Sequence, residues 1–216
     1  MANGITINDN CINLIKKLLP NGGTILEFGS GEGTTWLADA GYTMFSVENQ
    51  EEWMNKFPNH TTYINCGIKY YDSEYTAPRN IFDQTGWYNP DDLFPNLPSK
   101  YDLILVDGPG SRWGRAGFFK HIDKFNIDVP MVFDDINRTQ DSDVMESVSD
   151  YVDRDYEIID IYTGVKNIGN SSFIMEFEII NQKKELLTYI ENTYVSYDRI
   201  KEKSKSIPED IRKILS

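Results

Sequence analysis

The stretch YDLILVD, residues 101–107, limits the fold most strongly, because it is almost entirely apolar. A strand with one solvated face alternates apolar and polar residues, whereas a strand covered on both faces is apolar throughout. This run is therefore typical of a central strand in a parallel sheet with helices on both sides. Other short strand-like runs alternate with helical patterns along the chain, and this alternation predicts an α/β fold.

Seven segments predict a doubly wound, mostly parallel, seven-stranded sheet, closed by an antiparallel pair. They are residues 24–28, 42–48, 61–65, 101–107, 130–135, 156–162 and 171–180. In such a sheet we expect the fourth strand beside the first and the fifth beside the fourth. Residues 1–182 would form this domain, and the Lys/Glu-rich residues 183–216 predict a C-terminal helical extension for self-association.

One long segment, residues 68–98, interrupts the alternation of strands and helices and contains four prolines and seven aromatic residues. An irregular segment of this length inside a compact domain usually has a function, such as a binding loop. We therefore expect it to form a lid over an acceptor substrate.

Composition narrows the class of partner. The chain of 216 residues is long enough to bury a sizeable core, and its net charge is −13. Such an acidic protein repels phosphate backbones, so nucleic acid is not an expected partner. The sequence has two cysteines without paired spacing, and it shows no signal-peptide pattern and no apolar run of membrane-spanning length. These features predict a cytoplasmic protein without a membrane partner.

The stretch TILEFGSGEGTTWLAD, residues 24–39, places three glycines between a predicted strand and a predicted helix. A dinucleotide fingerprint, Gly-x-Gly-x-x-Gly, is not met, because Thr34 or Trp36 stands at its third glycine position. Glu27, two residues before the first glycine, would repel a pyrophosphate but suits a ligand with an ammonium group. S-adenosylmethionine is such a ligand. A plain tight turn is the alternative explanation of the glycines.

Glu48 ends the second predicted strand, 21 residues after Glu27. An acidic side chain at this place can accept hydrogen bonds from ribose hydroxyls. A solvated strand end is the alternative explanation.

The motif LEFGSGEGT resembles class I S-adenosylmethionine-dependent methyltransferases, and the resemblance extends over about residues 24–180. It implies a Rossmann-like methyltransferase fold with S-adenosylmethionine as the cofactor. The cofactor-binding residues that the resemblance implies are Glu27, Gly29, Ser30, Gly31, Gly33, Thr34, Glu48 and Asn49, with Asn65 and Cys66 at the adenine.

Three carboxylates follow the fourth and fifth strands: Asp107, Asp134 and Asp135. Because ligands bind at the carboxyl ends of parallel strands, we expect these side chains to converge beside the methyl donor. A divalent cation, Mg²⁺ or Mn²⁺, would relieve their mutual repulsion and could hold an acceptor hydroxyl. Alternatively, the aspartates cap helices or bind the ammonium group of the methyl donor.

The segments VDGPGSRWGRAGFF and VFDDINR are similar to glucuronoxylan methyltransferases and their bacterial relatives. The three aspartates also resemble the metal site of divalent-cation-dependent O-methyltransferases, including those that act on macrolide sugars. Together these resemblances imply a sugar acceptor.

Aromatic and basic residues are candidates for binding that acceptor, because sugar rings pack on aromatic faces. The candidates are Tyr71, Trp87, Tyr88, Arg112, Trp113 and Arg115. Tyr75 and the other aromatic residues of 68–98 could equally fill a minor core. The arginines could bind an acidic acceptor, or they could neutralise the aspartates.

The sequence as a whole predicts an S-adenosylmethionine-dependent O-methyltransferase that acts on a sugar, a glycan or a small metabolite with help from a metal. Asp107 or Asp135 would accept the proton of the acceptor hydroxyl. Two alternatives stay open: a metal-independent N- or O-methyltransferase, and a non-catalytic nucleoside-binding subunit of a complex.

Overall fold

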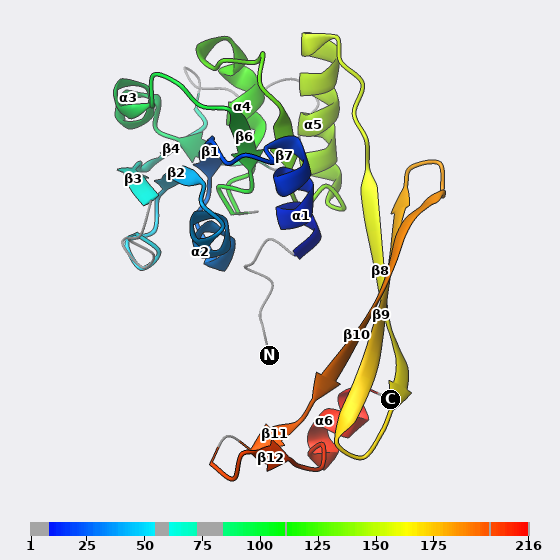
Figure 1. Cartoon of the computed structure of the whole chain (residues 1–216). Coiled ribbons are helices and arrows are strands. Elements are labelled where there is room, and N and C mark those ends of the chain that lie inside the picture. The colour runs from blue at the N-terminus through cyan, green and yellow to red at the C-terminus, as the bar shows by residue number, and fades with distance from the viewer. Residues whose placement is uncertain (1–8, 55–60, 73–83, 111, 199, 216) are drawn as a thin grey trace. The chain divides into compact units, whose positions relative to one another are not determined.

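A five-stranded parallel sheet lies at the centre of the first of two units in this computed structural model. The structure describes residues 9–54, 61–72, 84–110, 112–198 and 200–215. Unit 1 is Met1–Arg154 and unit 2 is Asp155–Ser216 (Figure 1).

The central sheet has the strand order β3-β2-β1-β6-β7, and each adjacent pair is parallel. Its strands are β1 (Thr24–Phe28), β2 (Thr43–Glu48), β3 (Thr61–Asn65), β6 (Leu103–Val106) and β7 (Met131–Phe133). The predicted neighbours are confirmed, because β6 pairs with β1 and β7 pairs with β6. All five carboxyl ends therefore lie along one edge of the sheet.

Both faces of this sheet are covered. All four residues of β6 are fully buried, as the apolar run of the sequence predicts. Ile104 and Val106 belong to one core cluster, while Leu103 and Leu105 belong to the other. The covering helices are α1 (Asp9–Leu18), α2 (Glu32–Asp39), α3 (Pro90–Leu93), α4 (Ala116–Lys120) and α5 (Thr139–Val152), with 3-10 turns η1 (Phe94–Asn96) and η2 (Ile122–Lys124).

The segment 68–98 is only partly irregular. It contains the antiparallel strands β4 (Ile68–Tyr70) and β5 (Gly86–Tyr88), followed by α3 and η1. Its central part, 73–83, lies outside the described residues, and Tyr75 lies there. The predicted lid therefore stays a prediction.

The seven-stranded sheet was a wrong prediction, because the last two strands join a different sheet. In unit 2, β8 (Ile159–Ile168), β9 (Ser172–Asn181) and β10 (Leu186–Val195) form an antiparallel sheet of order β10-β9-β8. Strand β9 is paired along both of its edges by β8 and β10. Its pairing is therefore complete without the parallel sheet.

The helical extension over 183–216 was also wrong. Residues 186–195 form β10, followed by the short strands β11 (Tyr197–Asp198) and β12 (Lys203–Ser204) and by one helix, α6 (Glu209–Leu215). The side chain of Asn181 accepts hydrogen bonds from the N–H groups of Lys183 and Glu185, which turns the chain from β9 into β10. The boundary consequently falls after Arg154, not after residue 182. None of the helices in the described ranges has the length and apolarity needed to cross a membrane.

Candidate functional site

Glu27 carries a buried carboxylate at the carboxyl end of β1, with only 1% of the residue exposed. Its oxygens accept hydrogen bonds from the Thr34 hydroxyl at 2.9 and 3.1 Å and from the Ser46 hydroxyl. No lysine, arginine or histidine in the described part of the chain forms an ion pair with Glu27. Burial raises the pKa of Glu27 to about 8, although both hydroxyl groups oppose the rise.

Ser46 is a site residue that the sequence analysis did not identify. It lies directly beside Glu27 in the pairing of β1 with β2, and it is fully buried. A serine inside the otherwise apolar strand TMFSVE was the available signal, since a buried hydroxyl needs a hydrogen-bond partner.

The glycine loop after β1 is held close to the end of β6. Gly29 has φ +91°, and a Cβ atom there would lie 3.0 Å from both the amide nitrogen and the Cα of Gly108. The N–H of Gly31 donates to the Thr34 hydroxyl at 3.0 Å, so one side chain binds both the loop and Glu27. Gly29 is thus required by the packing of two strand ends, whatever ligand binds nearby.

Replacing Gly29 by alanine should destabilise the protein by about 2 kcal/mol more than replacing Gly41 by alanine. Both glycines have positive φ, +91° and +98°, but a Cβ atom at Gly41 meets nothing within 4 Å. Gly41→Ala therefore measures the backbone strain alone, and the difference measures the close approach to Gly108. Urea unfolding of both variants gives the two free energies, and equal losses would contradict this packing.

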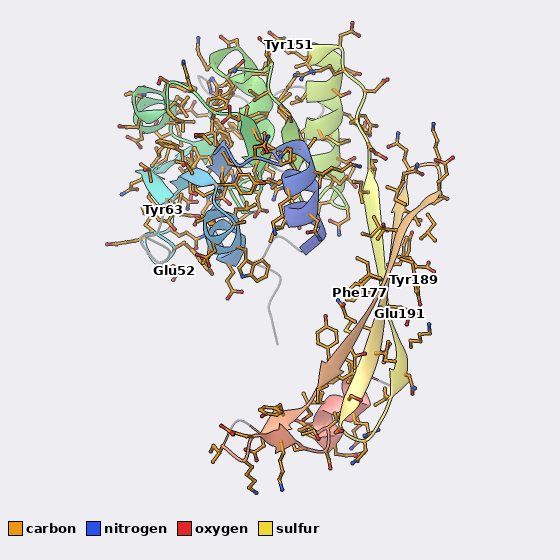
Figure 2. The ribbon with its side chains drawn as sticks, in the orientation of Figure 1. Glu52, Tyr63, Tyr151, Phe177, Tyr189 and Glu191 are labelled. Atoms are coloured by element: carbon orange, nitrogen blue, oxygen red, sulfur yellow. The ribbon has the colours of Figure 1, made fainter. Side chains whose placement is uncertain are left out.

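Glu48 connects the glycine loop to the turn after β2. Its Oε2 accepts from the N–H of Ser30 at 2.9 Å, while Oε1 accepts from the N–H groups of Asn49 and Gln50 at 2.7 Å each. Ser30 also donates through its hydroxyl to the Tyr63 hydroxyl at 3.3 Å; Tyr63, on β3, is labelled in Figure 2. Two carboxylate oxygens offer about four acceptor positions, so Glu48 can still accept from a ligand hydroxyl.

The two residues expected at an adenine ring differ in their exposure. Asn65 is exposed at the carboxyl end of β3. Cys66 is fully buried in the core, and its thiol donates to the carbonyl of Asn89 at 3.4 Å. Cys66 therefore packs in the core, and its predicted contact with a cofactor stays a prediction.

The three predicted aspartates are brought together, as expected, but around an arginine. Arg115 precedes α4 and is 1% exposed. Its Nη2 lies 3.3 Å from Oδ1 of Asp107 and 2.9 Å from Oδ2 of Asp135, and it donates to the carbonyl of Asp107 at 2.5 Å. Its Nη1 donates to the carbonyl of Asp134. Arg115 was expected at the acceptor; in the structure its guanidinium group is instead engaged by these aspartates and carbonyl oxygens.

The predicted metal site does not fit this arrangement. The cation between these aspartates is a guanidinium group, and Oδ1 of Asp134 accepts from the N–H of Asp135 at 2.8 Å. Among the residues that the structure describes, no group of three or more His, Cys, Asp or Glu side chains is placed to hold a metal ion. Of the alternatives for the arginines, neutralisation of the acids fits Arg115.

Asp141, which the sequence analysis also missed, contacts both arginines of this cluster, Arg115 and Arg138. It lies in the first turn of α5 and is 2% exposed. Its Oδ2 is 2.7 Å from Nε of Arg138, and its Oδ1 is 3.8 Å from Nε of Arg115. Arg138 also pairs with Asp135. An aspartate in a first helical turn ordinarily stabilises the helix, so nothing in the sequence distinguished Asp141.

Asp107 has the electrostatic properties of a proton acceptor. Burial raises its pKa to about 7, and the neighbouring Asp134 and Asp135 act in the same direction, while Arg115 opposes them. About a fifth of its side chain stays exposed, 23%. Asp135, the other candidate acceptor, binds Arg115 and Arg138 through the same oxygen. Asp107 is therefore the better candidate.

No family model matches the chain, and no curated protein matches it in sequence. Among solved structures, the CcbJ methyltransferase from Streptomyces caelestis is similar at 9% identity and TM-score 0.34, over 86% of this chain and 70% of that chain. The glycopeptide N-methyltransferase MtfA is similar at 10% identity and TM-score 0.28, over 95% and 76%. Likenesses at these scores establish neither fold nor function.

The aromatic candidates divide into buried and accessible residues. Trp87 and Tyr88 are fully buried against Phe28, with ring centroids 5.8 and 6.0 Å away, so both rings pack in the core of the ligand-free chain. Their predicted contact with an acceptor stays a prediction. Tyr71 is half-buried beside the same core cluster.

Arg112 and Trp113 remain accessible after β6. Arg112 is exposed and lies 5.7 Å above the ring of Trp113, which is half-buried. Thr85 anchors this turn, because its N–H donates to the carbonyl of Trp113 at 3.0 Å and its hydroxyl donates to that of Arg112 at 2.9 Å. Of the predicted acceptor residues, these two are the best placed to meet a ligand.

Proposed function

We propose that unit 1 binds S-adenosylmethionine at the carboxyl ends of β1 and β2 and transfers its methyl group to an acceptor hydroxyl. The observation that carries this proposal is the state of Glu27. This carboxylate is buried, lies beside the glycine loop and has no cationic partner among the described residues. A buried carboxylate is stabilised by an opposite charge, and a ligand ammonium group would supply one.

The same residues disfavour a phosphate-containing ligand. Glu27 is the last but one residue of β1 and Glu48 is the last residue of the adjacent parallel strand β2, and both are almost completely buried. A pyrophosphate beside them would place like charges together in a poorly solvated site. A positively charged nucleoside without a phosphate would instead be attracted by both carboxylates.

Each residue has a defined task in this proposal. Glu27 would bind the ammonium group, and Glu48 would accept from the ribose hydroxyls. Gly29 lets the loop lie flat against Gly108, since neither residue has a side chain. When bound, S-adenosylmethionine supplies an electrophilic methyl group. Asp107 would accept the proton of the hydroxyl, because a pKa of about 7 suits a general base near neutral pH.

A sugar or a small hydroxylated metabolite remains the proposed acceptor. Arg112 and Trp113 support it, since an indole face packs against the C–H face of a sugar and a guanidinium group binds carboxylates. Arg115 already provides the positive charge between the aspartates, so the proposed transfer proceeds without a metal ion.

The test is transfer of a labelled methyl group from S-adenosylmethionine to a panel of sugars, uronic acids and small alcohols, with and without EDTA. We expect turnover on at least one acceptor, unchanged by EDTA. Loss of turnover with EDTA would support the metal-dependent alternative. Binding of the methyl donor without turnover on any acceptor would instead support a non-catalytic subunit.

A further inference from the structure

We infer that Arg115 is a built-in cation that takes the place of a metal ion between β6 and β7. The inference rests on the geometry of Arg115 and does not depend on the proposed function. Its side chain is almost completely buried, and its two Nη atoms contact backbone or carboxylate oxygens of Val106, Asp107, Asp134 and Asp135. These four residues are the last residue of β6, the residue after it and the two residues after β7.

A guanidinium group is suited to this task because its donors have a fixed planar arrangement and it stays charged at any working pH. Arg115 binds carbonyl oxygens from both strand ends as well as carboxylates, so it fixes the spacing of the two ends. A hard divalent cation uses the same kinds of oxygen ligand. The two cations therefore compete for one place.

Asp141 and Arg138 hold Arg115 in position. Asp141 is buried with its carboxylate between the Nε atoms of the two arginines. Arg138 pairs in turn with Asp135, and this closes a network of two arginines and three aspartates, namely Asp107, Asp135 and Asp141. A buried charge is tolerated when it is paired in this way. Asp141 is thus a positioning residue for Arg115.

The test uses Mn²⁺ alone, titrated calorimetrically into the full chain. We expect no detectable Mn²⁺ binding by the wild type and a measurable Mn²⁺ site in Arg115→Gln, because the aspartates lose their cation. Arg112→Gln is the matched control, since Arg112 is exposed and outside the network; it should bind no Mn²⁺. Circular dichroism establishes that each variant is folded.

Two results would overturn the inference. One is Mn²⁺ binding by the wild type that disappears in Asp107→Asn. The other is a folded Arg115→Gln that binds Mn²⁺ no better than the wild type. If Arg115→Gln does not fold, Arg115→Lys and the wild type still decide, because both keep the positive charge and must both exclude Mn²⁺.

Discussion

Replacing Glu27 by glutamine is expected to weaken S-adenosylmethionine binding by roughly 100-fold, since it removes the charge that pairs with the ammonium group. Glutamine has the same shape and can still bond with Thr34 and Ser46, so the loop should keep its structure. Calorimetric titration of wild type and variant with S-adenosylmethionine measures the ratio. Glu52→Gln is the control, because Glu52 is exposed on the surface (Figure 2).

The same substitution should stabilise the ligand-free protein at high pH. Burial raises the pKa of Glu27 from 4.5 to about 8. Between these values the folded state keeps a proton that the unfolded state has released, so stability falls as pH rises through this interval. Glu27→Gln removes this fall, so between pH 4 and pH 8 its stability should gain about 4 kcal/mol relative to that of the wild type.

Urea unfolding of Glu27→Gln and the wild type at several pH values gives this difference. The Glu52→Gln control should follow the wild type at every pH. A constant offset between Glu27→Gln and the wild type across the range would show that folding does not raise the pKa of Glu27. Its hydrogen bonds alone would then stabilise the carboxylate, and the need for a ligand cation, which is the main support for the proposal, would be lost.

Replacing Asp107 by asparagine should lower kcat by about 100- to 10,000-fold, the usual contribution of a general base. The affinity for the methyl donor should change little, because the donor is proposed to lie against Glu27 and Glu48. With the wild type, kcat/KM should increase as pH rises through about 7, where Asp107 loses its proton, and this increase should be absent from the variant. Asp39→Asn, at the exposed end of α2, is the control.

Turnover of a labelled methyl group at saturating acceptor, measured from pH 5.5 to 9, tests this role. A variant with unchanged kcat and the same pH profile as the wild type would exclude Asp107 as the proton acceptor. In that case Asp107 would serve only as a ligand of Arg115.

The parallel sheet could be predicted from the sequence because its signals are local. The apolar run before Asp107 identifies a strand covered on both faces, and the charge of Glu27 in TILEF marks the site at the strand end. Burial of both segments followed from their composition, and the pairing of β6 with β1 and β7 is confirmed.

The fate of residues 156–195 could not be predicted from the same signals. A strand pattern predicts extended backbone, but it does not identify the neighbouring strand, which depends on contacts distant in sequence. For residues 186–195 the signal itself was available, because Thr, Tyr, Ile and Val are typical of strands. The charged residues on either side, typical of a solvated helix, concealed it.

Which side chains meet at the site also depends on tertiary contacts, which the sequence does not reveal. Nothing in the sequence indicates that Arg115 turns back onto Asp107 and Asp135, because an arginine near aspartates is equally compatible with an exposed position. Trp87 is buried because β5 pairs with β4 and brings the ring against Phe28. Such contacts join segments that are far apart in the chain.

Calorimetric titration of the full chain with S-adenosylmethionine, NAD and ATP tests the central claim most directly. Glu27 is buried and has no cationic partner among the described residues, so we expect heat and a single site for S-adenosylmethionine, the same with EDTA, and no binding of the two phosphate-containing nucleotides. Tight binding of NAD or ATP, with no heat from S-adenosylmethionine, would contradict it.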